Sequence, residues 1–312
     1  MRYIVPAGDS KKTVKEVLLG SIGISVSFLR HLKFLDNGIM LNGKKVTVRA
    51  ILNEGDVLDI ATENEREGSR LTPTDIPLDI IYEDGDLVVP SKPANMPTHP
   101  SYNHHGDTLA DALAYRYRND TESFVFRPIN RLDRNTSGLT LIAKNRIGAS
   151  RLSEQMRSGL IKKQYVAILD GIIPDDRGSI ETYLRRTAQS IIVREVCSKQ
   201  DDADYALTHF LTLARGEKHS LVLASPETGR THQLRVHFAH LGCPILGDDM
   251  YGTPSDMIDR HALHAVALSF NQPSTDQRLT LFAPLPDDMR KLVLELFGEA
   301  LTNSLYEHYD FL

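Results

Sequence analysis

The sequence predicts an α+β protein built from a small N-terminal unit and a larger second unit. Three observations support this prediction. Two short amphipathic segments and a hairpin pattern occupy the start of the chain, a polar stretch follows, and the remainder contains both paired strand-like segments and amphipathic helices. A length of 312 residues is enough for two such units, each with a buried core.

Composition limits the class of protein. Hydrophobic residues make up 41% of the chain and charged residues 25%, which is typical of a soluble globular protein. Residues 1–6 lack the pattern of a signal peptide, and no apolar run of about 18 residues predicts a membrane span. Cys197 and Cys243 form neither a Cys-x-x-Cys pair nor a disulfide framework. We therefore expect a cytoplasmic protein without membrane association.

The N-terminal unit, residues 1–62, is predicted to contain two helices, a hairpin and a last short strand. Apolar residues recur at helical spacing in the first two segments, and Ser25 or Ser27 is a candidate N-cap of the second. Asn42-Gly43 predicts a type I′ turn in the hairpin. The expected elements are helices over residues 13–19 and 25–35 and strands over residues 39–41, 44–48 and 57–60.

Residues 63–77 are predicted to be a linker, because Glu, Gly, Ser and Pro dominate and apolar residues are few. The larger unit, residues 78–312, begins with a hairpin turned at residues 83–86. A proline-rich loop follows at residues 90–100, and its prolines restrict the backbone that carries Lys92 and His99.

Further along the larger unit, Asn145 can cap a helix that Gly159 ends. Residues 170–202 are polar and rich in turn residues. Arg185, Arg186 and Arg194 there could face RNA or solvent, and for each alone we favour solvent. The other expected elements are strands over residues 164–169, 206–214 and 219–224 and a closing amphipathic helix over residues 287–300.

One loop carries the strongest chemical signal. Asp133 lies between Arg131 and Arg134 in the stretch Arg-Leu-Asp-Arg, and the turn-forming residues Asn-Thr-Ser-Gly follow before an apolar strand. A tight loop that leads into a buried strand is a common location for catalytic residues. The plain alternative is a surface aspartate with two solvated arginine neighbours.

The loop resembles the signature of the RluA-type RNA pseudouridine synthases, His-Arg-Leu-Asp-x-x-Thr-Ser-Gly-Leu. It departs from that pattern only at Asn130, where the family has His. The resemblance extends over residues 78–285 through further ordered motifs. These are the Lys-Pro-x-x-Met-x-x-His-Pro loop at residues 92–100, Lys-x-Tyr at residues 163–165, and Gly-Arg-Thr-His-Gln-Leu-Arg-Val-His at residues 229–237. Residues 1–62 resemble the S4 RNA-binding module.

The resemblance implies a catalytic domain with a mixed, largely antiparallel sheet and a cleft across its face. It implies that Asp133 is catalytic, with Arg230 as its ion-pair partner and Tyr165 beside the base. It also implies substrate contacts from Arg131 and Leu234. The family role of the loop that carries Lys92 and His99 is structural as much as chemical, and these two side chains are further candidates for substrate contact. Arg131 would fill or brace the space that the uridine leaves, and Leu234 would form the floor of the pocket.

Physical chemistry supports the same assignment. Isomerising uridine to pseudouridine breaks the N-glycosidic bond and joins the sugar to C5 of the uracil, and one carboxylate suffices for this as nucleophile or base. The sequence leaves both routes open. Burial favours the neutral acid, so an adjacent arginine is needed to keep the carboxylate ionised and oriented. We expect no cofactor and no metal, and we place His237 and His240 on a helix surface rather than in a metal site.

The expected partner is RNA, ribosomal RNA rather than transfer RNA, and the protein is expected to act as a monomer. A net charge of −5 argues against tight, non-specific nucleic-acid binding. However, residues 1–62 contain nine Lys and Arg against six Asp and Glu, so positive charge concentrates there. The competing hypothesis is a catalytically inactive RNA-binding protein on the same scaffold.

Overall fold

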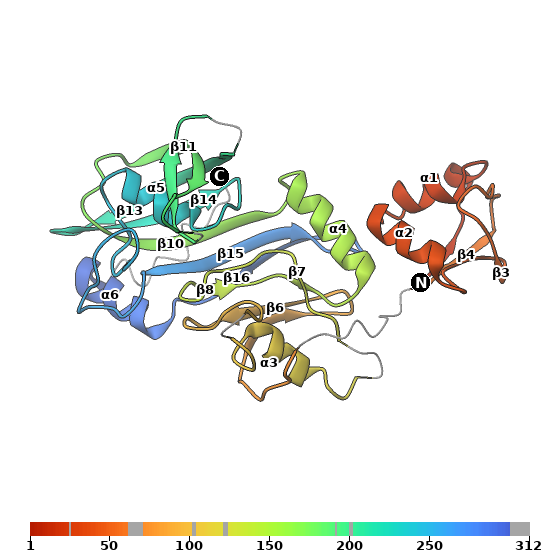
Figure 1. The fold of residues 1–312 in the computed structure, drawn as a ribbon, viewed down its shortest axis with the longest axis horizontal. Helices are drawn as coiled ribbons and strands as arrows, with labels where there is room; N and C mark the ends of the chain where they lie inside the picture. Colours follow the sequence, from red (N-terminus) through yellow and green to blue (C-terminus); the bar gives the residue numbers. More distant parts are fainter. Residues whose placement is uncertain are drawn as a thin grey trace.

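The computed structural model describes residues 1–24, 26–61, 71–101, 104–120, 124–190, 192–199 and 202–299. Within this part of the chain, the N-terminal unit contains a four-stranded sheet and the larger unit a twelve-stranded sheet (Figure 1). Strand pairing in the large sheet is antiparallel except between one pair of strands. The predicted α+β class with a mixed, mostly antiparallel sheet is confirmed.

The N-terminal sheet has the strand order β1-β4-β2-β3 and shares one apolar core with two short helices. Its elements are β1 (Arg2–Ile4), α1 (Val14–Leu19), α2 (Val26–Phe34), β2 (Ile39–Leu41), β3 (Lys44–Lys45) and β4 (Val57–Ile60). Asn42 and Gly43 have φ values of +50° and +77°, as a type I′ turn requires. The predicted hairpin is therefore confirmed, whereas Ser25 and the side chain of Ser27 lie outside the described residues.

Helix α4 (Arg146–Arg157) joins the two units. In Figure 1 it lies between the large sheet and the N-terminal helices. Ile147 packs into the N-terminal core, and Arg151 Nε donates a hydrogen bond to the backbone oxygen of Ile22 at 2.8 Å. Asn145 caps this helix as predicted, because its Oδ1 accepts from the backbone N–H of Gly148 at 2.7 Å.

The large sheet has the order β12-β11-β13-β14-β10-β15-β8-β6-β9-β7, with β16 on β15 and β5 on β6. Its strands are β5 (Asp79–Glu83), β6 (Leu87–Lys92), β7 (Arg127–Pro128), β8 (Ser137–Leu139), β9 (Ile142–Ala143), β10 (Lys162–Asp170), β11 (Arg177–Arg186), β12 (Arg194–Cys197), β13 (Asp204–Arg215), β14 (His219–Pro226), β15 (Leu263–Asn271) and β16 (Arg278–Phe282). The central strands β10, β14 and β15 are almost wholly buried and contribute most of the core.

Three further helices pack against this sheet. Helix α3 (Leu109–Arg116) shares a core with β6 and β9, and α5 (Gln233–His240) packs by Phe238 against Phe210 of β13. Helix α6 (Asp287–Phe297) ends earlier than predicted, at Gly298, and residue 300 lies outside the described residues. No sequence-based prediction covered α3, although Thr108 and Asp111 form a capping box at its start.

The structure adds to one expectation for a polar segment and corrects another. Residues 170–202 contain strands β11 and β12, because alternate residues of β11 are buried and its other face stays polar. Arg185 pairs there with Glu195 at 2.8 Å. His237 is not on a helix surface, because it is fully buried and hydrogen-bonded to the hydroxyls of Thr182 and Thr208.

The predicted linker is only partly described. Residues 63–70 lie outside the described residues, but Thr72 and Thr74 are bound to α3. The backbone N–H of Thr72 donates to Asp111 Oδ1 at 2.8 Å, and that of Thr74 to the backbone oxygen of Asp111 at 3.2 Å. The last part of this segment is therefore held against the larger unit.

The parallel pair in the large sheet is β8 against β15, in which Ser137 faces His264 and Gly138 faces Ala265. Gly138 has a φ of +112°, and a Cβ there would lie 2.2 Å from the backbone oxygen of Ala265. Only glycine allows the two backbones to approach so closely. This contact sets the end of the loop that carries Asp133.

We predict that Gly138→Ala destabilises the protein by more than about 4 kcal/mol, because backbone on both sides of the clash would have to move. Gly159 is the matched control. It also has positive φ (+72°), but no atom lies within 4 Å of its Cβ position, so Gly159→Ala should cost about 1 kcal/mol. Urea unfolding of both variants measures the difference, and equal losses would contradict the proposed clash.

Candidate active site

Asp133 lies on the loop between β7 and β8 and lines a cleft of about 600 Å³. The other walls of the cleft come from β10, from the segment that follows β14 and from the start of α5. The residues that line it include His99, Asn130, Arg131, Arg157, Lys163, Tyr165, Glu227, Arg230, His232, Leu234 and Arg235. All but one of the predicted site residues therefore meet in one place.

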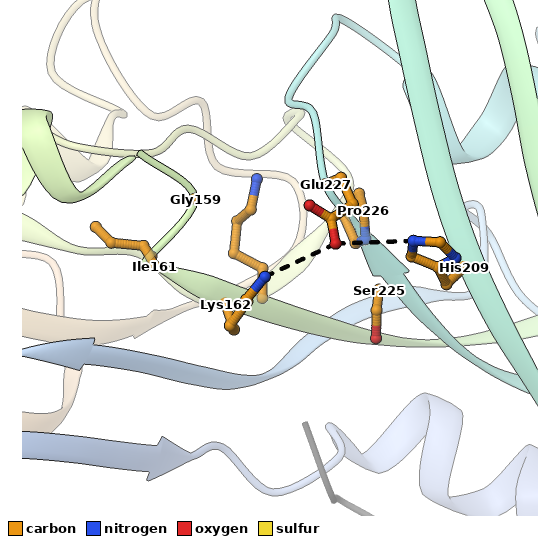
Figure 2. A pocket seen from close by; sticks show the side chains of 8 residues that line it. Gly159, Ile161, Lys162, His209, Ser225, Pro226 and Glu227 are labelled. Atoms are coloured by element: carbon orange, nitrogen blue, oxygen red, sulfur yellow. Dashed lines mark ion pairs between the residues drawn. The ribbon is translucent and has the colours of Figure 1, made fainter. Parts of the chain in front are cut away.

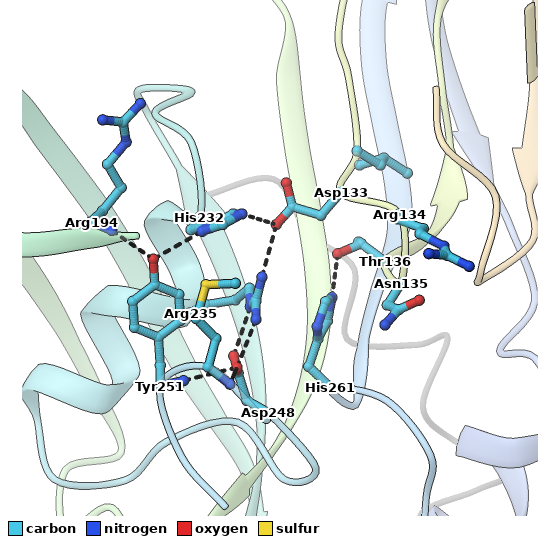
Figure 3. Close-up of polar contacts among 12 residues, drawn as sticks. Asp133, Arg134, Asn135, Thr136, Arg194, His232, Arg235, Asp248, Tyr251 and His261 are labelled. Atoms are coloured by element: carbon cyan, nitrogen blue, oxygen red, sulfur yellow. Dashed lines mark hydrogen bonds and ion pairs between the residues drawn. The ribbon is translucent and has the colours of Figure 1, made fainter. Parts of the chain in front are cut away.

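Two hydroxyl–histidine contacts hold the Asp133 loop on the sheet. Thr136 Oγ1 shares a hydrogen bond with His261 Nε2 at 2.8 Å (Figure 3), and Ser137 Oγ shares one with His264 Nδ1 at 2.9 Å. Burial lowers the pKa of His261 to about 3 and that of His264 to about 4. Both imidazoles are therefore neutral at physiological pH and can accept from the hydroxyls.

Arg260 also binds the loop that carries Asp133. Its Nη1 donates to the backbone oxygen of Asn135 at 3.1 Å, and its Nε and Nη2 bind the carboxylate of Asp288 at 2.7 and 3.0 Å. Asp288 belongs to the first turn of α6, so the loop is connected to the closing helix. This arginine was not identified from the sequence, where nothing distinguishes it from a surface residue.

Lys92 is the predicted site residue that does not line the cleft. It is fully buried, and its Nζ donates to the backbone oxygens of Pro93, Met96 and Arg134 at 2.9, 2.8 and 3.1 Å. Burial lowers its pKa to about 7. The expected substrate contact is wrong, because the three ammonium hydrogens are used to hold the proline-rich loop against the Asp133 loop.

Figure 3 shows two cationic or potentially cationic groups that face Asp133. Arg235 Nη1 lies 3.6 Å from Asp133 Oδ2, and His232 Nε2 lies 3.8 Å from the same oxygen. Burial lowers the pKa of His232, although the charge of Asp133 opposes this effect. Arg235 is therefore the charged partner of the carboxylate at neutral pH.

Arg235 is itself held in one orientation. Its Nε and Nη2 each donate to a carboxylate oxygen of Asp248 at 2.7 Å, and the ring of Tyr251 lies 5.1 Å from its guanidinium carbon. Burial alone would lower the pKa of Arg235, but Asp248 raises it above its ordinary value. Burial also favours the neutral form of Asp248, yet Arg235 holds the pKa of that carboxyl below its ordinary value. The pair is thus fully ionised, with one guanidinium edge left for Asp133.

The predicted pairing of Arg230 with Asp133 is wrong. Arg230 is exposed, its Nη1 lies 3.4 Å from Asp204, and its Nε donates to the backbone oxygen of Tyr205 at 2.9 Å. The chain turns at His232, which has a φ of +59°, before α5 begins. Arg230, before that turn, is exposed at the cleft, whereas Arg235, inside the helix, lies beside Asp133.

Tyr165 and Leu234 form the apolar part of the cleft. Tyr165 is 8% exposed and Leu234 6% exposed, and both belong to the main core cluster. Burial raises the pKa of Tyr165 well above its ordinary value, and the charge of Asp133 adds to this. The phenol is therefore neutral at physiological pH and presents a flat face and a hydroxyl.

Arg131 and His99 also line the cleft. Arg131 is exposed, whereas His99 is half-buried and its Nδ1 has no hydrogen-bond partner in the described residues. Burial lowers the pKa of His99, and the charge of Arg131 lowers it further. The imidazole is therefore neutral at physiological pH, and its Nδ1, unpaired among the described residues, is shielded from solvent.

Asn130, the departure from the family signature, has a structural role. Its Nδ2 donates to the backbone oxygen of Leu139 at 3.3 Å, and its Oδ1 accepts from the backbone N–H of Leu141 at 2.7 Å. Both bonds fix the strand that follows the Asp133 loop. The substitution therefore leaves that loop fully supported.

Comparisons with known proteins identify the family of the chain. Residues 86–240 match a family model described as RNA pseudouridylate synthase. An uncharacterized RNA pseudouridine synthase of Bacillus subtilis (strain 168) is 37% identical over 281 residues, covering 90% of this chain and 98% of the relative. The chain belongs to the RNA pseudouridylate synthase family. It is therefore an isomerase that acts on RNA.

A second relative connects this RNA pseudouridine synthase to the RluA type. Ribosomal large subunit pseudouridine synthase D of Vibrio cholerae is 33% identical over 289 residues and covers 88% of each chain. The resemblance seen in the motifs is thereby confirmed. Among the described helices, none has the length and apolar character needed to cross a bilayer.

Solved structures of this family share the fold. Human RNA pseudouridylate synthase domain containing 1 aligns with a TM-score of 0.57 and 29% identity, over 67% of this chain and 83% of the human one. Human RNA pseudouridylate synthase domain containing 4 aligns with a TM-score of 0.56 at 23% identity, over 69% and 91%, and supports the fold alone.

We predict that the stability of this synthase falls on acidification partly through His264. Its pKa is about 4 when folded, below the ordinary value of 6.5, so the unfolded chain binds more protons between these pH values. The stabilisation is complete above pH 6.5 and declines towards pH 4, by at most about 1.4 kcal/mol per pH unit. The free energy of unfolding of His264→Gln, measured from pH 7 to pH 4.5, should fall less steeply than that of the wild type. Parallel curves would contradict this prediction.

Proposed function

We propose that Asp133 is the catalytic carboxylate, either as nucleophile or as base. The observation that carries the proposal is its position in the cleft, which Tyr165 also lines. There Asp133 Oδ2 lies 3.6 Å from Nη1 of Arg235, whose orientation is fixed. Glu227 is the other carboxylate among the described lining residues. It is exposed and lies 3.7 Å from both Lys162 and His209, so it is already paired.

Arg235 is proposed to keep Asp133 charged and aimed at the sugar. Two of its nitrogens are bound by Asp248, so its remaining edge cannot turn away from the cleft. A positive charge fixed in advance costs no reorganisation when charge moves during the reaction. Arg230 is proposed to act at the rim, where its guanidinium can meet the RNA backbone.

Tyr165 and Leu234 are proposed to hold the uracil. The face of the phenol offers stacking, and the apolar floor accepts a base that has left its helix. Because the pKa of Tyr165 is raised, no standing phenolate is available, and stacking is its first role. Assistance in removing the C5 proton would require transfer of the phenol proton in the same step.

The charges around the cleft support RNA as the substrate. Five arginines and lysines line it, against two carboxylates, in a chain whose net charge is −5. Local positive charge of this kind attracts a polyanion whatever the total charge. A uridine in a loop or hairpin tip is the natural target, because it leaves its stack at the lowest cost.

We propose ribosomal RNA as the substrate, the cytoplasm as the location and the monomer as the active form. The name of the Vibrio cholerae relative and the S4-like sequence of residues 1–62 support the first. Lys33, Lys45 and Arg49 line a second hollow of about 550 Å³ on that N-terminal unit, where RNA could bind. The enzyme assignment, rather than an inactive RNA-binding protein, is favoured by the comparisons and by the supporting role of Asn130.

We predict that Asp133→Asn loses pseudouridine formation by at least about 10³-fold while its fold is retained. A host that lacks this enzyme is complemented with the wild type or the variant, and pseudouridine is mapped in its ribosomal and transfer RNA. Only the wild type should restore a modification, and it should lie in ribosomal RNA. Asp176→Asn is the control, because that carboxylate is exposed and pairs with Arg215. Restoration by both Asp133→Asn and the wild type would overturn the assignment of Asp133, and restoration in transfer RNA alone would overturn the substrate.

A second prediction separates the two arginines of the same motif. Arg235→Lys should lower kcat by about 10²-fold, because lysine cannot bind Asp248 through two nitrogens and still face Asp133. Arg230→Lys should change kcat by less than about tenfold and act mainly on KM. Steady-state kinetics with a melting curve for each variant provide the test, and a larger loss of kcat in Arg230→Lys would contradict the observed pairing.

A further inference from the structure

Lys163 is a buried lysine that neither the fold nor the proposed chemistry uses. It lies on β10, two residues before Tyr165, and is only 9% exposed. It lines the catalytic cleft as well as a small pocket beside it. No hydrogen bond or ion pair to its Nζ occurs among the described residues, although Lys92, the other deeply buried lysine, has three acceptors.

The nearest acidic residue does not neutralise Lys163. Figure 2 shows Glu227 paired with Lys162 and with His209, each at 3.7 Å. Gly229 lies beside Lys163, because a Cβ added to it would be 3.7 Å from Lys163 Nζ. Burial lowers the pKa of Lys163 to about 8, and the charge of Glu227 only partly offsets this. An unpaired ammonium on a side chain that is mostly shielded from water is costly, so its presence at a ligand cleft favours an anionic ligand.

We propose that Lys163 binds one of the two RNA phosphates that flank the flipped-out uridine. The proposal rests on the proposed position of the uracil on Tyr165. Residues 163 and 165 are separated by about 6.6 Å along the strand, which is comparable to the separation of a base and its own backbone phosphate. A phosphate supplies the full negative charge that the site lacks, whereas a uracil carbonyl is neutral. Gly229 leaves the facing wall open for the phosphate oxygens.

Because no partner of Lys163 occurs among the described residues, removal of its charge should not lower the stability of the free protein. Lys163→Met keeps the length of the side chain and removes the unpaired charge. We expect the melting temperature of this variant to equal or exceed that of the wild type, by up to a few degrees. A marked fall would overturn the premise that the ammonium is unpaired in the free enzyme.

The binding test uses full-length protein and an RNA hairpin that carries the uridine identified by the mapping experiment. Dissociation constants are measured in the Asp133→Asn background, so that no conversion occurs. Three hairpins are compared: one with natural phosphates, one with a neutral methylphosphonate 5′ to the uridine and one with it 3′ to the uridine. We expect Lys163→Met to weaken binding of the natural hairpin about tenfold and to reduce the slope of log K against log salt by about 1.

A double-mutant cycle identifies the contact. At one of the two positions, the methylphosphonate should weaken binding about tenfold when Lys163 is present. It should leave the binding of the Lys163→Met protein unchanged. Lys162→Met is the matched control, because that neighbouring lysine is half-exposed and paired with Glu227, and it should remain sensitive to the neutral linkage. The contrary outcome is that the effects of the methylphosphonate and of Lys163→Met on the free energy of binding add at both positions. Lys163 then contacts something other than a flanking phosphate, such as the base, and the proposal is overturned.

The cycle is independent of the assignment of Asp133. If Asp133→Asn still forms pseudouridine, the proposed catalytic role fails whatever Lys163 binds. The binding constants are then measured with the product, pseudouridine, in place of the target, so that no further conversion occurs. If Asp133→Asn is inactive but the cycle shows additivity, the phosphate site alone fails. Steady-state kinetics complete the distinction. Losing a phosphate contact that is made equally before and during the reaction should raise KM and leave kcat within about threefold.

Discussion

The buried ion pair between Arg235 and Asp248 is the interaction on which the site depends. Both side chains are shielded from solvent, and the two 2.7 Å hydrogen bonds between them fix the plane of the guanidinium. A pair this deeply buried adds little net stability, since desolvation offsets most of the attraction. Its value lies in orientation, because the remaining edge of Arg235 faces the carboxylate of Asp133 before any RNA arrives.

That carboxylate can be placed so closely because its loop ends in the parallel pairing of β8 with β15. Gly138 permits the approach of the two backbones, and Ser137 and its neighbour Thr136 bind neutral histidines beneath the loop. Lys92 binds the loop from the other side through the backbone oxygen of Arg134. Buried polar groups are costly when unpaired, so a fully bonded network holds a loop in one conformation.

The distribution of charge explains how an acidic protein can act on RNA. The net charge of the chain is −5, yet the lining of the cleft is rich in arginine and lysine. Most of these cations have a protein partner: Arg235 has Asp248, Arg230 has Asp204, and Arg157 has Glu154. Lys163 has none among the described residues. Lys163 is therefore the cation of the cleft whose substitution best tests where the RNA backbone binds.

Local pattern alone determined the position of Asp133, the Asn42-Gly43 turn, the cap at Asn145 and the family, because each depends on residues close together in the chain. Tertiary structure decided which arginine of the motif at residues 229–237 meets the aspartate. The number of residues between two positions does not say where their side chains point. A backbone turn with positive φ, such as the one before α5, changes that direction. For the same reason, only the folded protein separates a buried structural lysine from one that is left free to bind.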